Sequence, residues 1–335
     1  MARAGLTRCL PRSRRARRDA DRADRRADAR HRGTHVAREL GIGLRTDQEP
    51  AAYEAIARRA EDAGVDVVSV FHDLLYQPAI GPLLLMARVT ERIRLGPAAL
   101  NPFTLHPYEI AGQIAMLDAV SGGRAYLGLA KGAWLDRLGI DEPRPLSALQ
   151  EAVAIVQALL AGDDSGVAGE RFTLEPGTTL AYPRVRERVP LLLGTWGPDT
   201  ARWAGTVAGE VKIGGTANAE LLPVVRDWIA NPGVRLVVGC VTVVDEDGDW
   251  ARARAAAVVQ PYLDVVARHD PTLVPGEAPR LERFCIAGTP EEVAERVLEL
   301  WEAGADRVEL GTPQGRTPLG GVDLICERVL PLLGR

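Results

Sequence analysis

The sequence predicts a single (β/α)₈ barrel with insertions, preceded by a disordered, charged N-terminal tail. From Leu40 to the C-terminus, eight strand-like segments alternate with helix-like segments, as they do in barrels of this class. Most of the strand segments are continuously apolar, which is typical of parallel strands that are covered on both faces. The chain has 335 residues, 46% of them hydrophobic, and this is enough for one barrel of about 250 residues.

Short apolar runs, several of them rich in β-branched residues, define the strands. The predicted strands cover residues 40–44, 65–71, 93–100, 124–129, 189–194, 210–214, 235–244 and 307–310. Helical spacing of apolar residues predicts helices over residues 51–63, 82–90, 106–120, 147–160, 198–208, 219–230, 289–303 and 322–333. A further helix is predicted to begin at residue 249. Gly64 is a natural end for the first helix, and Thr289-Pro290-Glu291-Glu292 is a capping signal. Residues 161–188 and 261–283 fit neither element, and we interpret them as insertions.

Residues 1–35 are predicted to lie outside the domain, which we assign to residues 36–335. The tail is dominated by Arg, Asp and Ala and contains few large apolar side chains, so it cannot offset the entropy lost on ordering. A basic arm for nucleic acid and a transit peptide are alternatives, although the many aspartates argue against a transit peptide.

Composition excludes several classes of protein. A net charge of −4 and 5% aromatic residues give no support for a nucleic-acid partner or a membrane surface. The four cysteines are far apart in the sequence and no His or Cys cluster occurs, so we expect no disulfide framework and no metal site. No apolar run reaches about 18 residues. We therefore expect a cytoplasmic protein that acts on a small molecule.

Ligands of such barrels bind at the carboxyl ends of the strands, and this rule selects the candidate site residues. After the fifth strand, Thr195, Trp196, Gly197, Pro198, Asp199 and Thr200 form a turn into a helix. The amide groups and dipole of that helix can hold a phosphate, although an ordinary turn with proline at the first helical position explains the segment equally well. Lys131-Gly132 follows the fourth strand, where a lysine can hold an anion or remain solvated.

Two adjacent titratable residues, His72 and Asp73, end the second strand. His72 is a candidate proton donor because its pKa lies near working pH, but a structural, hydrogen-bonded histidine is as plausible. His106 opens a helix, and we interpret it as helix-terminal packing. The motifs of phosphate-binding P-loops, dinucleotide-binding Rossmann folds and serine hydrolases are all missing.

One stretch carries a family resemblance. His106-Pro107, the helix that ends in Asp118-Ala119-Val120-Ser121-Gly122-Gly123-Arg124, and the strand Leu127-Gly128-Leu129 resemble the luciferase-like monooxygenase family. Gly197-Pro198, Ala208-Gly209-Glu210-Val211 and Gly288-Thr289-Pro290-Glu291-Glu292 also match. The likeness covers about residues 39–335. The Thr-Trp-Gly-Pro-Asp-Thr and Glu-Val-Lys-Ile-Gly-Gly segments are similar to the branch that uses deazaflavin F420, as methylenetetrahydromethanopterin reductase does.

The resemblance implies a cofactor site and a reaction class. Members hold the cofactor against a bulge in the third strand, here Pro97, Ala98 and Ala99, and we expect a cis peptide at Ala98–Ala99. The cofactor phosphate is expected near residues 197–200 and near Gly214, Gly215 and Thr216. Lys131, Gly132, Thr195 and Trp196 are further candidate cofactor-binding residues. Trp134 or Trp196 is expected to lie against the ring or the substrate, although packing in the core explains either tryptophan equally well. The order His72-Asp73 departs from the usual Asp-His, and Ala130-Lys131-Gly132-Ala133 lacks the usual acidic residue.

The implied activity is hydride transfer between F420 and a small organic C=N or C=C substrate, with His72 or Asp73 as the catalytic proton donor, in a homodimer. A flavin-dependent monooxygenase using FMN and a non-catalytic flavin-binding barrel are the alternatives.

Overall fold

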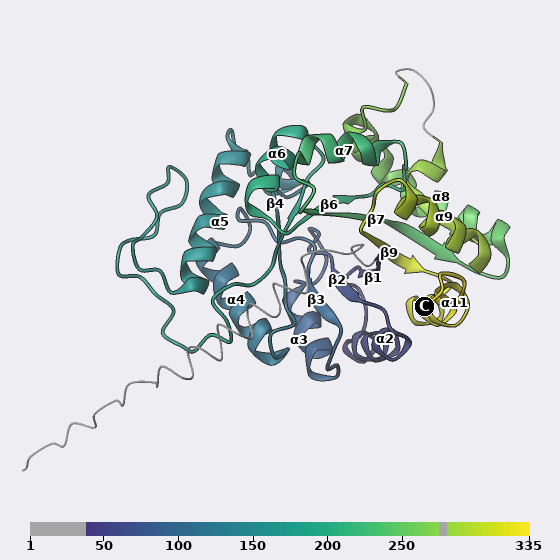
Figure 1. The fold of residues 1–335 in the computed structure, drawn as a ribbon, viewed down its shortest axis with the longest axis horizontal. Coiled ribbons are helices and arrows are strands. Elements are labelled where there is room, and N and C mark those ends of the chain that lie inside the picture. The colour runs from purple at the N-terminus through teal and green to yellow at the C-terminus, as the bar shows by residue number, and fades with distance from the viewer. Residues whose placement is uncertain (1–37, 275–279) are drawn as a thin grey trace, which may run out of the picture. The chain divides into compact units, whose positions relative to one another are not determined.

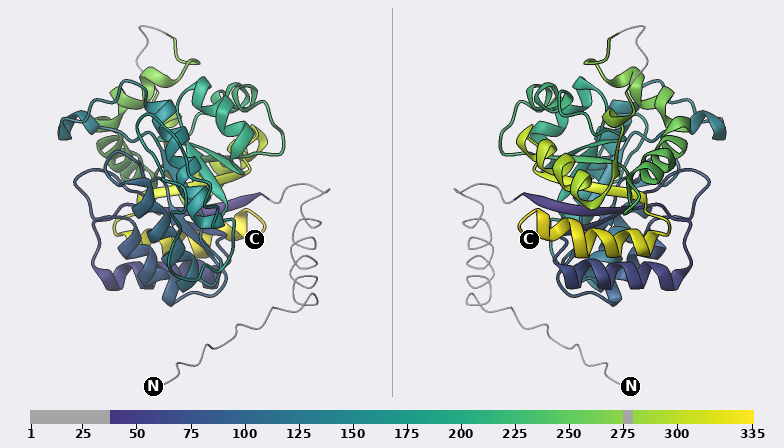
Figure 2. Two further views of the ribbon diagram at one scale, coloured as in Figure 1. Left: turned by 90° about the vertical axis from the view of Figure 1, so that its left-hand side faces the viewer. Right: turned by 90° about the vertical axis from the view of Figure 1, so that its right-hand side faces the viewer.

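A parallel β-barrel surrounded by helices is the architecture of this chain (Figures 1 and 2). The computed structural model describes residues 38–274 and 280–335. Within these ranges eight strands form the barrel in the order β3-β2-β1-β9-β7-β6-β5-β4. The barrel strands are β1 (Glu39–Leu44), β2 (Val67–Val70), β3 (Arg94–Pro97), β4 (Leu127–Ala130), β5 (Leu191–Gly194), β6 (Glu210–Gly214), β7 (Arg235–Val244) and β9 (Arg307–Gln314). Parallel bridges Leu95–Ala125 and Leu100–Leu129 join β3 to β4, so the barrel is nearly closed and the predicted fold class is confirmed.

The helices lie outside the strands and bury their apolar faces against them. They are α2 (Pro50–Ala63), α3 (Ile80–Arg88), α4 (Pro107–Val120), α5 (Pro145–Ala161), α6 (Pro198–Val207), α7 (Leu221–Ile229), α8 (Gly248–Val266), α9 (Pro290–Glu302), α10 (Pro318–Leu324) and α11 (Leu330–Leu332). Short helical turns occur at η1 (Leu135–Leu138), η2 (Ala267–His269), η3 (Leu281–Arg283) and η4 (Ile325–Val329). Gly64 ends α2 with a φ of 86°, and Thr289 and Glu292 form the complete capping box of α9, as the sequence predicts.

The region after β7 differs from the sequence-based expectation in two ways. Helix α8 runs through Pro261 to Val266, although we assigned residues from 261 onward to an insertion. A proline removes one helical hydrogen bond, and the packing of the rest of α8 against β7 and residues 285–288 compensates for that loss. Strand β8 (Cys285–Gly288) was missed because it directly follows the residues that we assigned to an insertion, and it pairs with the carboxyl end of β7.

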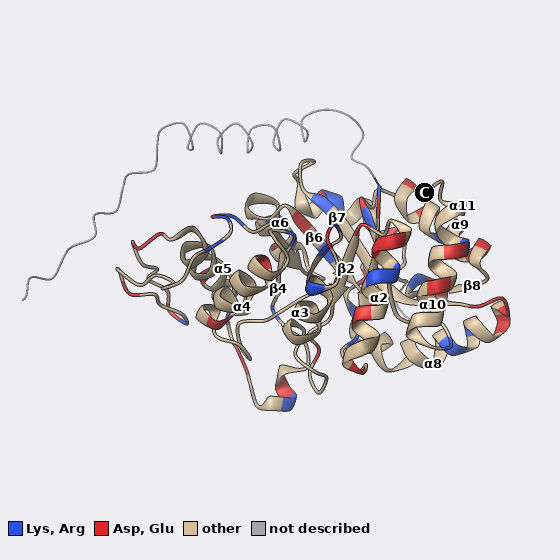
Figure 3. Cartoon of the chain, turned by 90° about the horizontal axis from the view of Figure 1, so that it is seen from below, with Lys and Arg blue, Asp and Glu red and all other residues tan. Residues whose placement is uncertain are grey.

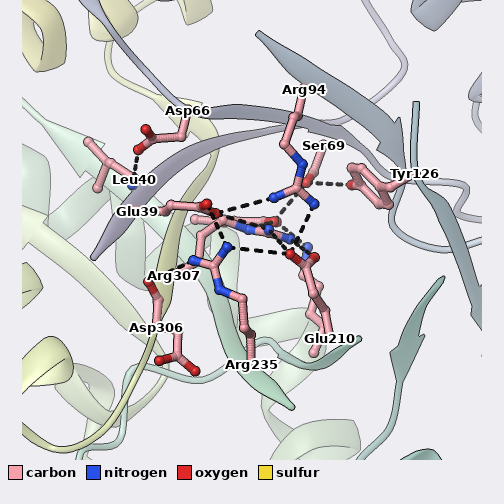
Figure 4. Close-up of polar contacts among 12 residues, drawn as sticks. Glu39, Leu40, Asp66, Ser69, Arg94, Tyr126, Glu210, Arg235, Asp306 and Arg307 are labelled. Carbon is pink, nitrogen blue, oxygen red and sulfur yellow. Dashed lines mark hydrogen bonds and ion pairs between the residues drawn. The ribbon is translucent and has the colours of Figure 1, made fainter. Parts of the chain in front are cut away.

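Charged side chains fill the amino-terminal end of the barrel interior (Figure 4). The guanidinium of Arg307, which is 0% exposed, lies 2.9 Å from carboxylate oxygens of both Glu210 and Glu309. Arg94 pairs with Glu210 at 3.0 Å, and Arg235 pairs with Glu39 at 2.5 Å. Arg307 also lies 3.4 Å from Glu39, and together these contacts join β1, β3, β6, β7 and β9 near their first residues into one network.

Glycines make room for the large side chains of the interior. A Cβ atom at Gly41 would lie 2.8 Å from Cγ of Glu309, and one at Gly239 would lie 3.0 Å from Cε of Lys212. At Gly96 the added atom would lie 2.5 Å from the backbone oxygen of Tyr126. The interior of this barrel is therefore packed by pairing a residue without a side chain with one that has a long side chain.

Charged residues of both signs lie on the helices. Lys and Arg are interspersed with Asp and Glu over the helices (Figure 3). In the part of the chain that the structure describes, no helix is both long and apolar enough to cross a membrane. The predicted tail at residues 1–35 lies outside the described residues.

Candidate active site

A bulge after β3 forms one wall of the candidate site. The peptide bond Ala98–Ala99 is cis, as we expected. The Ala98 amide donates to Val70 at 2.8 Å, and the Leu100 amide donates to Gly128 at 3.0 Å. The chain thus stays bonded to β2 before the cis bond and to β4 after it, which places both alanines at the carboxyl ends of the barrel strands.

Two adjoining cavities open at this end of the barrel. The first, which we call the bulge cavity, has a volume of about 210 Å³ and contacts the ends of β2 to β6. The second, the α8 cavity, has a volume of about 220 Å³ and lies between α8 and the ends of β6, β7 and β9. The residues that line both are Asp73, Ala98, Ala133, Trp134, Trp196, Lys212 and Gly214.

The two candidate proton donors both reach this site, in different environments. Nδ1 of His72 accepts a hydrogen bond from the Ala79 amide at 3.3 Å, and burial lowers the pKa of His72. Asp73 lies where the cavities meet. Burial raises the pKa of Asp73, and the positive charges of Lys212 and Arg45 offset only part of that rise. Burial thus favours the neutral form of both groups, and Asp73 is the one that lines both cavities.

The loop after β4 contributes to the bulge cavity. Lys131 and Gly132 line it, and Gly132 has a φ of 82° with Asn101 directly beside it. Trp134 follows with a φ of 54°, and its ring packs edge-on against Tyr262 of α8, with ring centroids 5.8 Å apart. This loop and α8 thus meet above the cavities.

The turn into α6 has the geometry of a helix amino terminus beside a cavity. Thr195 and Trp196 line the bulge cavity, and Trp196 Nε1 donates to the Gly214 oxygen at 2.8 Å. The Thr195 hydroxyl accepts from the Gly197 amide at 3.0 Å. Pro198 is the first residue of α6, followed by Asp199, which is exposed, and Thr200, which is 1% exposed. Among the described residues, the Thr200 hydroxyl has no hydrogen-bond partner.

The segment after β6 is partly covered by α8. Gly214 lines both cavities, and a Cβ added there would meet no atom within 4 Å. A Cβ at Gly215 would lie 2.8 Å from Val266. The Thr216 amide donates to Gly239 at 3.4 Å, and its hydroxyl donates to Arg283 at 3.2 Å. A phosphate contact stays a prediction at both expected positions: Gly214 and Gly215 line the α8 cavity, whereas residues 197–200 line neither cavity.

His106 has a structural role. Its Nδ1 accepts from the Tyr108 amide at 3.2 Å and caps α4, in agreement with our interpretation. Cys240, Cys285 and Cys326 are buried and not in disulfides, and the described residues contain no group of three or more potential metal ligands.

Sequence reasoning missed Lys212, which lies at the floor of both cavities and is 6% exposed. Its ammonium pairs with the carboxylate of Glu309 and lies 5.1 Å from the centre of the Phe71 ring. A signal was present, because charged and apolar residues alternate in Glu210-Val211-Lys212-Ile213 and in Arg307-Val308-Glu309-Leu310. Period-two alternation in a barrel strand indicates that the charged residues face the interior.

Comparisons with known proteins support the same fold and family. The chain is 26% identical to 5,10-methylenetetrahydromethanopterin reductase of Methanopyrus kandleri, over 87% of this chain and 97% of the relative. It is 28% identical to F420-dependent glucose-6-phosphate dehydrogenase of Microbacterium testaceum, over 82% and 90%. The solved structure of the coenzyme F420 dependent tetrahydromethanopterin reductase from Methanopyrus kandleri superposes with a TM-score of 0.76 at 24% identity, covering 88% of this chain and 99% of that one. The family model for luciferase-like monooxygenases matches residues 27–307, and the chain therefore belongs to the luciferase-like monooxygenase family.

Proposed function

We propose that this protein is an F420-dependent oxidoreductase that transfers a hydride between the deazaflavin and a small organic C=N or C=C substrate. The observation that carries this proposal is the meeting of two cavities at Asp73, beside the cis bulge. Relatives whose names specify F420 support the choice of cofactor. Two neighbouring cavities allow a cofactor in one to lie against a substrate in the other, and direct hydride transfer requires this contact.

The residues of the bulge cavity fit a flat ring system. Its walls include Ala98, Ala99, Ala130, Gly194 and Gly214, so a ring can lie close to the backbone. The amino terminus of α6, with the unpartnered Thr200 hydroxyl and nearby Lys131, would hold the phosphate. When bound, the deazaflavin supplies the hydride-transfer chemistry.

The protein's own residues provide orientation, shielding from water and a proton. Trp134 and Trp196 wall both cavities and exclude solvent from their junction. A carboxyl group with a raised pKa at that junction, Asp73, is placed to give a proton to the substrate atom beside the carbon that accepts the hydride. The Ala79 amide donates to Nδ1 of His72, the ring nitrogen that would otherwise accept a proton. We therefore assign His72 a structural role in the loop after β2.

Titration of the purified chain with F420 and, separately, with FMN tests the cofactor assignment by fluorescence quenching. We expect tight binding of F420 and no binding of FMN. Binding of FMN alone would favour a flavin-dependent monooxygenase, and binding of neither would favour a barrel without a flavin-type cofactor. Either of these results contradicts the proposal.

We further propose that the protein is a cytoplasmic homodimer. Light scattering coupled to size-exclusion chromatography checks the dimer, since a monomeric mass at micromolar concentration would refute it.

A further inference from the structure

The α8 cavity has mostly apolar walls. Helix α8 contributes a row of valines and an aromatic ring, and β7 and the segment before β8 add further apolar groups. These residues are Val241, Val258, Val259, Tyr262, Val265, Val266 and Phe284. A cavity of this kind binds an apolar body well and discriminates against a polyol or a phosphate, whose polar groups would lose their contacts with water.

Two cationic side chains line this cavity, and one of them, Arg45, is paired with a carboxylate at the rim of the cavity. Nε of Arg45 donates to Oδ2 of Asp47 at 2.8 Å, and Nη2 donates to the same oxygen at 2.5 Å. The guanidinium also lies 5.0 Å from the centre of the Tyr76 ring. The charge of Arg45 is therefore balanced by Asp47 at the edge of the site, away from the junction of the two cavities.

The other cation, Lys212, is held at the floor in a different way. Among the described residues its ammonium makes one hydrogen bond, to Glu309, and an ammonium has three donors. The Glu309 carboxylate is fixed in turn by Arg307 at 2.9 Å and by the Ser69 hydroxyl at 2.7 Å. The carboxylate thus fixes the position of the ammonium while N–H groups remain for a ligand at the junction of the cavities.

We propose that Lys212, positioned by Glu309, is the polar anchor for the substrate, which is a compact apolar molecule with one hydrogen-bond-accepting oxygen or nitrogen. The valine-rich walls bind the apolar body, and the Lys212 ammonium donates to the acceptor atom. Because Asp73 lies beside Lys212, the anchored atom is also the one that a nearby proton can reach. The catalytic meaning of this anchor rests on the proposed function, whereas the binding preference does not.

Two fluorinated probes of similar shape test the anchor on the full chain. Fluorine NMR measures the binding of 4-fluoroacetophenone, which has a carbonyl, and of 1-ethyl-4-fluorobenzene, which has none. We expect the ketone to bind at least about tenfold more tightly, as a hydrogen bond from a charged donor predicts. Equal affinities, or no binding of either probe, would overturn the proposal.

Variants assign the difference to Lys212. The double variant Lys212→Met with Glu309→Gln removes both charges of the pair. In it we expect the ketone to bind as weakly as 1-ethyl-4-fluorobenzene, whose own affinity should not change. Arg137→Met is the control, since it removes an exposed cation that lines neither cavity, and it should leave the ratio of affinities unchanged. A preserved ketone preference in the double variant would refute the role of Lys212.

Competition with glucose 6-phosphate tests the substrate class. We expect it not to displace 4-fluoroacetophenone at millimolar concentration, and displacement would contradict an apolar substrate. The F420 titration separates the two proposals. Ketone preference without F420 binding supports the anchor and refutes only the cofactor assignment, whereas F420 binding without ketone preference refutes only the anchor.

Discussion

The two ends of the barrel interior use charge in opposite ways. At the amino-terminal end, Arg307, Arg94 and Arg235 face Glu210 and Glu39 in a closed network in which every charge has a partner (Figure 4). At the carboxyl end, Asp73 lies in a mostly apolar junction, and Lys212 has donors beyond its one partner. Buried charges that each face several opposite charges hold the fold together, whereas a buried ammonium with one partner at the wall of a cavity is available to a ligand.

The pKa shifts follow the same division. Burial alone would raise the pKa of Glu210, but Arg307, Arg94 and Arg235 outweigh it and bring the pKa to about 2. At Asp73 burial prevails over the positive charges of Lys212 and Arg45, and the pKa rises. The pKa values of two carboxyl groups in one barrel therefore shift in opposite directions, because Glu210 has more close cations than Asp73.

Removing the central cation of the network should give the largest loss of stability. Arg307→Met leaves Glu210, Glu39 and Glu309 with too few partners, and we expect a loss of about 3–5 kcal/mol in unfolding free energy. Urea unfolding measures it. Arg58→Ala is the control, because Arg58 pairs with Glu54 at 3.6 Å on the surface and should contribute less than about 0.5 kcal/mol. Similar losses in the two variants would show that the buried network has no special role.

A methyl group added between β3 and β4 should have the next largest effect. In Gly96→Ala the new atom meets the Tyr126 backbone oxygen, which cannot move easily, so we expect a loss of about 1–3 kcal/mol. Gly81→Ala in α3 meets no atom within 4 Å and should instead gain about 0.5–1 kcal/mol. Differential scanning calorimetry of both variants checks the opposite signs, and a neutral Gly96→Ala would contradict tight interior packing.

Acid should weaken the network over a defined range of pH. The pKa of Glu210 is about 2 in the folded chain and 4.5 for an unperturbed carboxyl, so its ionised form stabilises the fold above pH 4.5. That contribution is lost as pH falls from 4.5 toward 2. The difference in stability between the wild type and Glu210→Gln should therefore shrink over this range, and a constant difference would disprove the assignment.

The smallest change in stability is expected at Asp73. Because its folded pKa is raised, ionisation of Asp73 costs stability as pH rises through the folded pKa. Asp73→Asn should raise Tm slightly at pH 7 and leave it unchanged at pH 3, where the carboxyl is protonated in both folded and unfolded chains. A lower Tm at pH 7 would indicate that the carboxylate is stabilised by its neighbours instead.

Local signals in the sequence were sufficient for most of the fold. Apolar runs located the barrel strands, and the Gly64 and Thr289 signals located helix ends that the structure confirms. Helix α8 was cut short at Pro261 because a proline usually ends a helix, and β8 was missed because it follows the segment that we then assigned to an insertion.

The candidate site was only partly predictable. Asp73, Ala98 and Trp196 lie at strand ends, where the barrel rule places ligands, and the structure brings them to one cavity. The partnership of Lys212 with Glu309 joins residues 97 positions apart, so nothing near Lys212 in the sequence reveals it. The degree of burial that separates Asp73 from His72 likewise depends on α8 and on loops distant in sequence.

The glycines of the barrel interior give a rule for comparing family members. Gly41 leaves space for Glu309 and Gly239 leaves space for Lys212, so each long side chain depends on a partner that lacks one. We therefore expect covariation: a relative that replaces Lys212 or Glu309 by a short apolar residue can accept alanine or a larger residue at the matching glycine. Members that keep all four residues would share the polar anchor, and could be recognised from their sequences before any substrate is known.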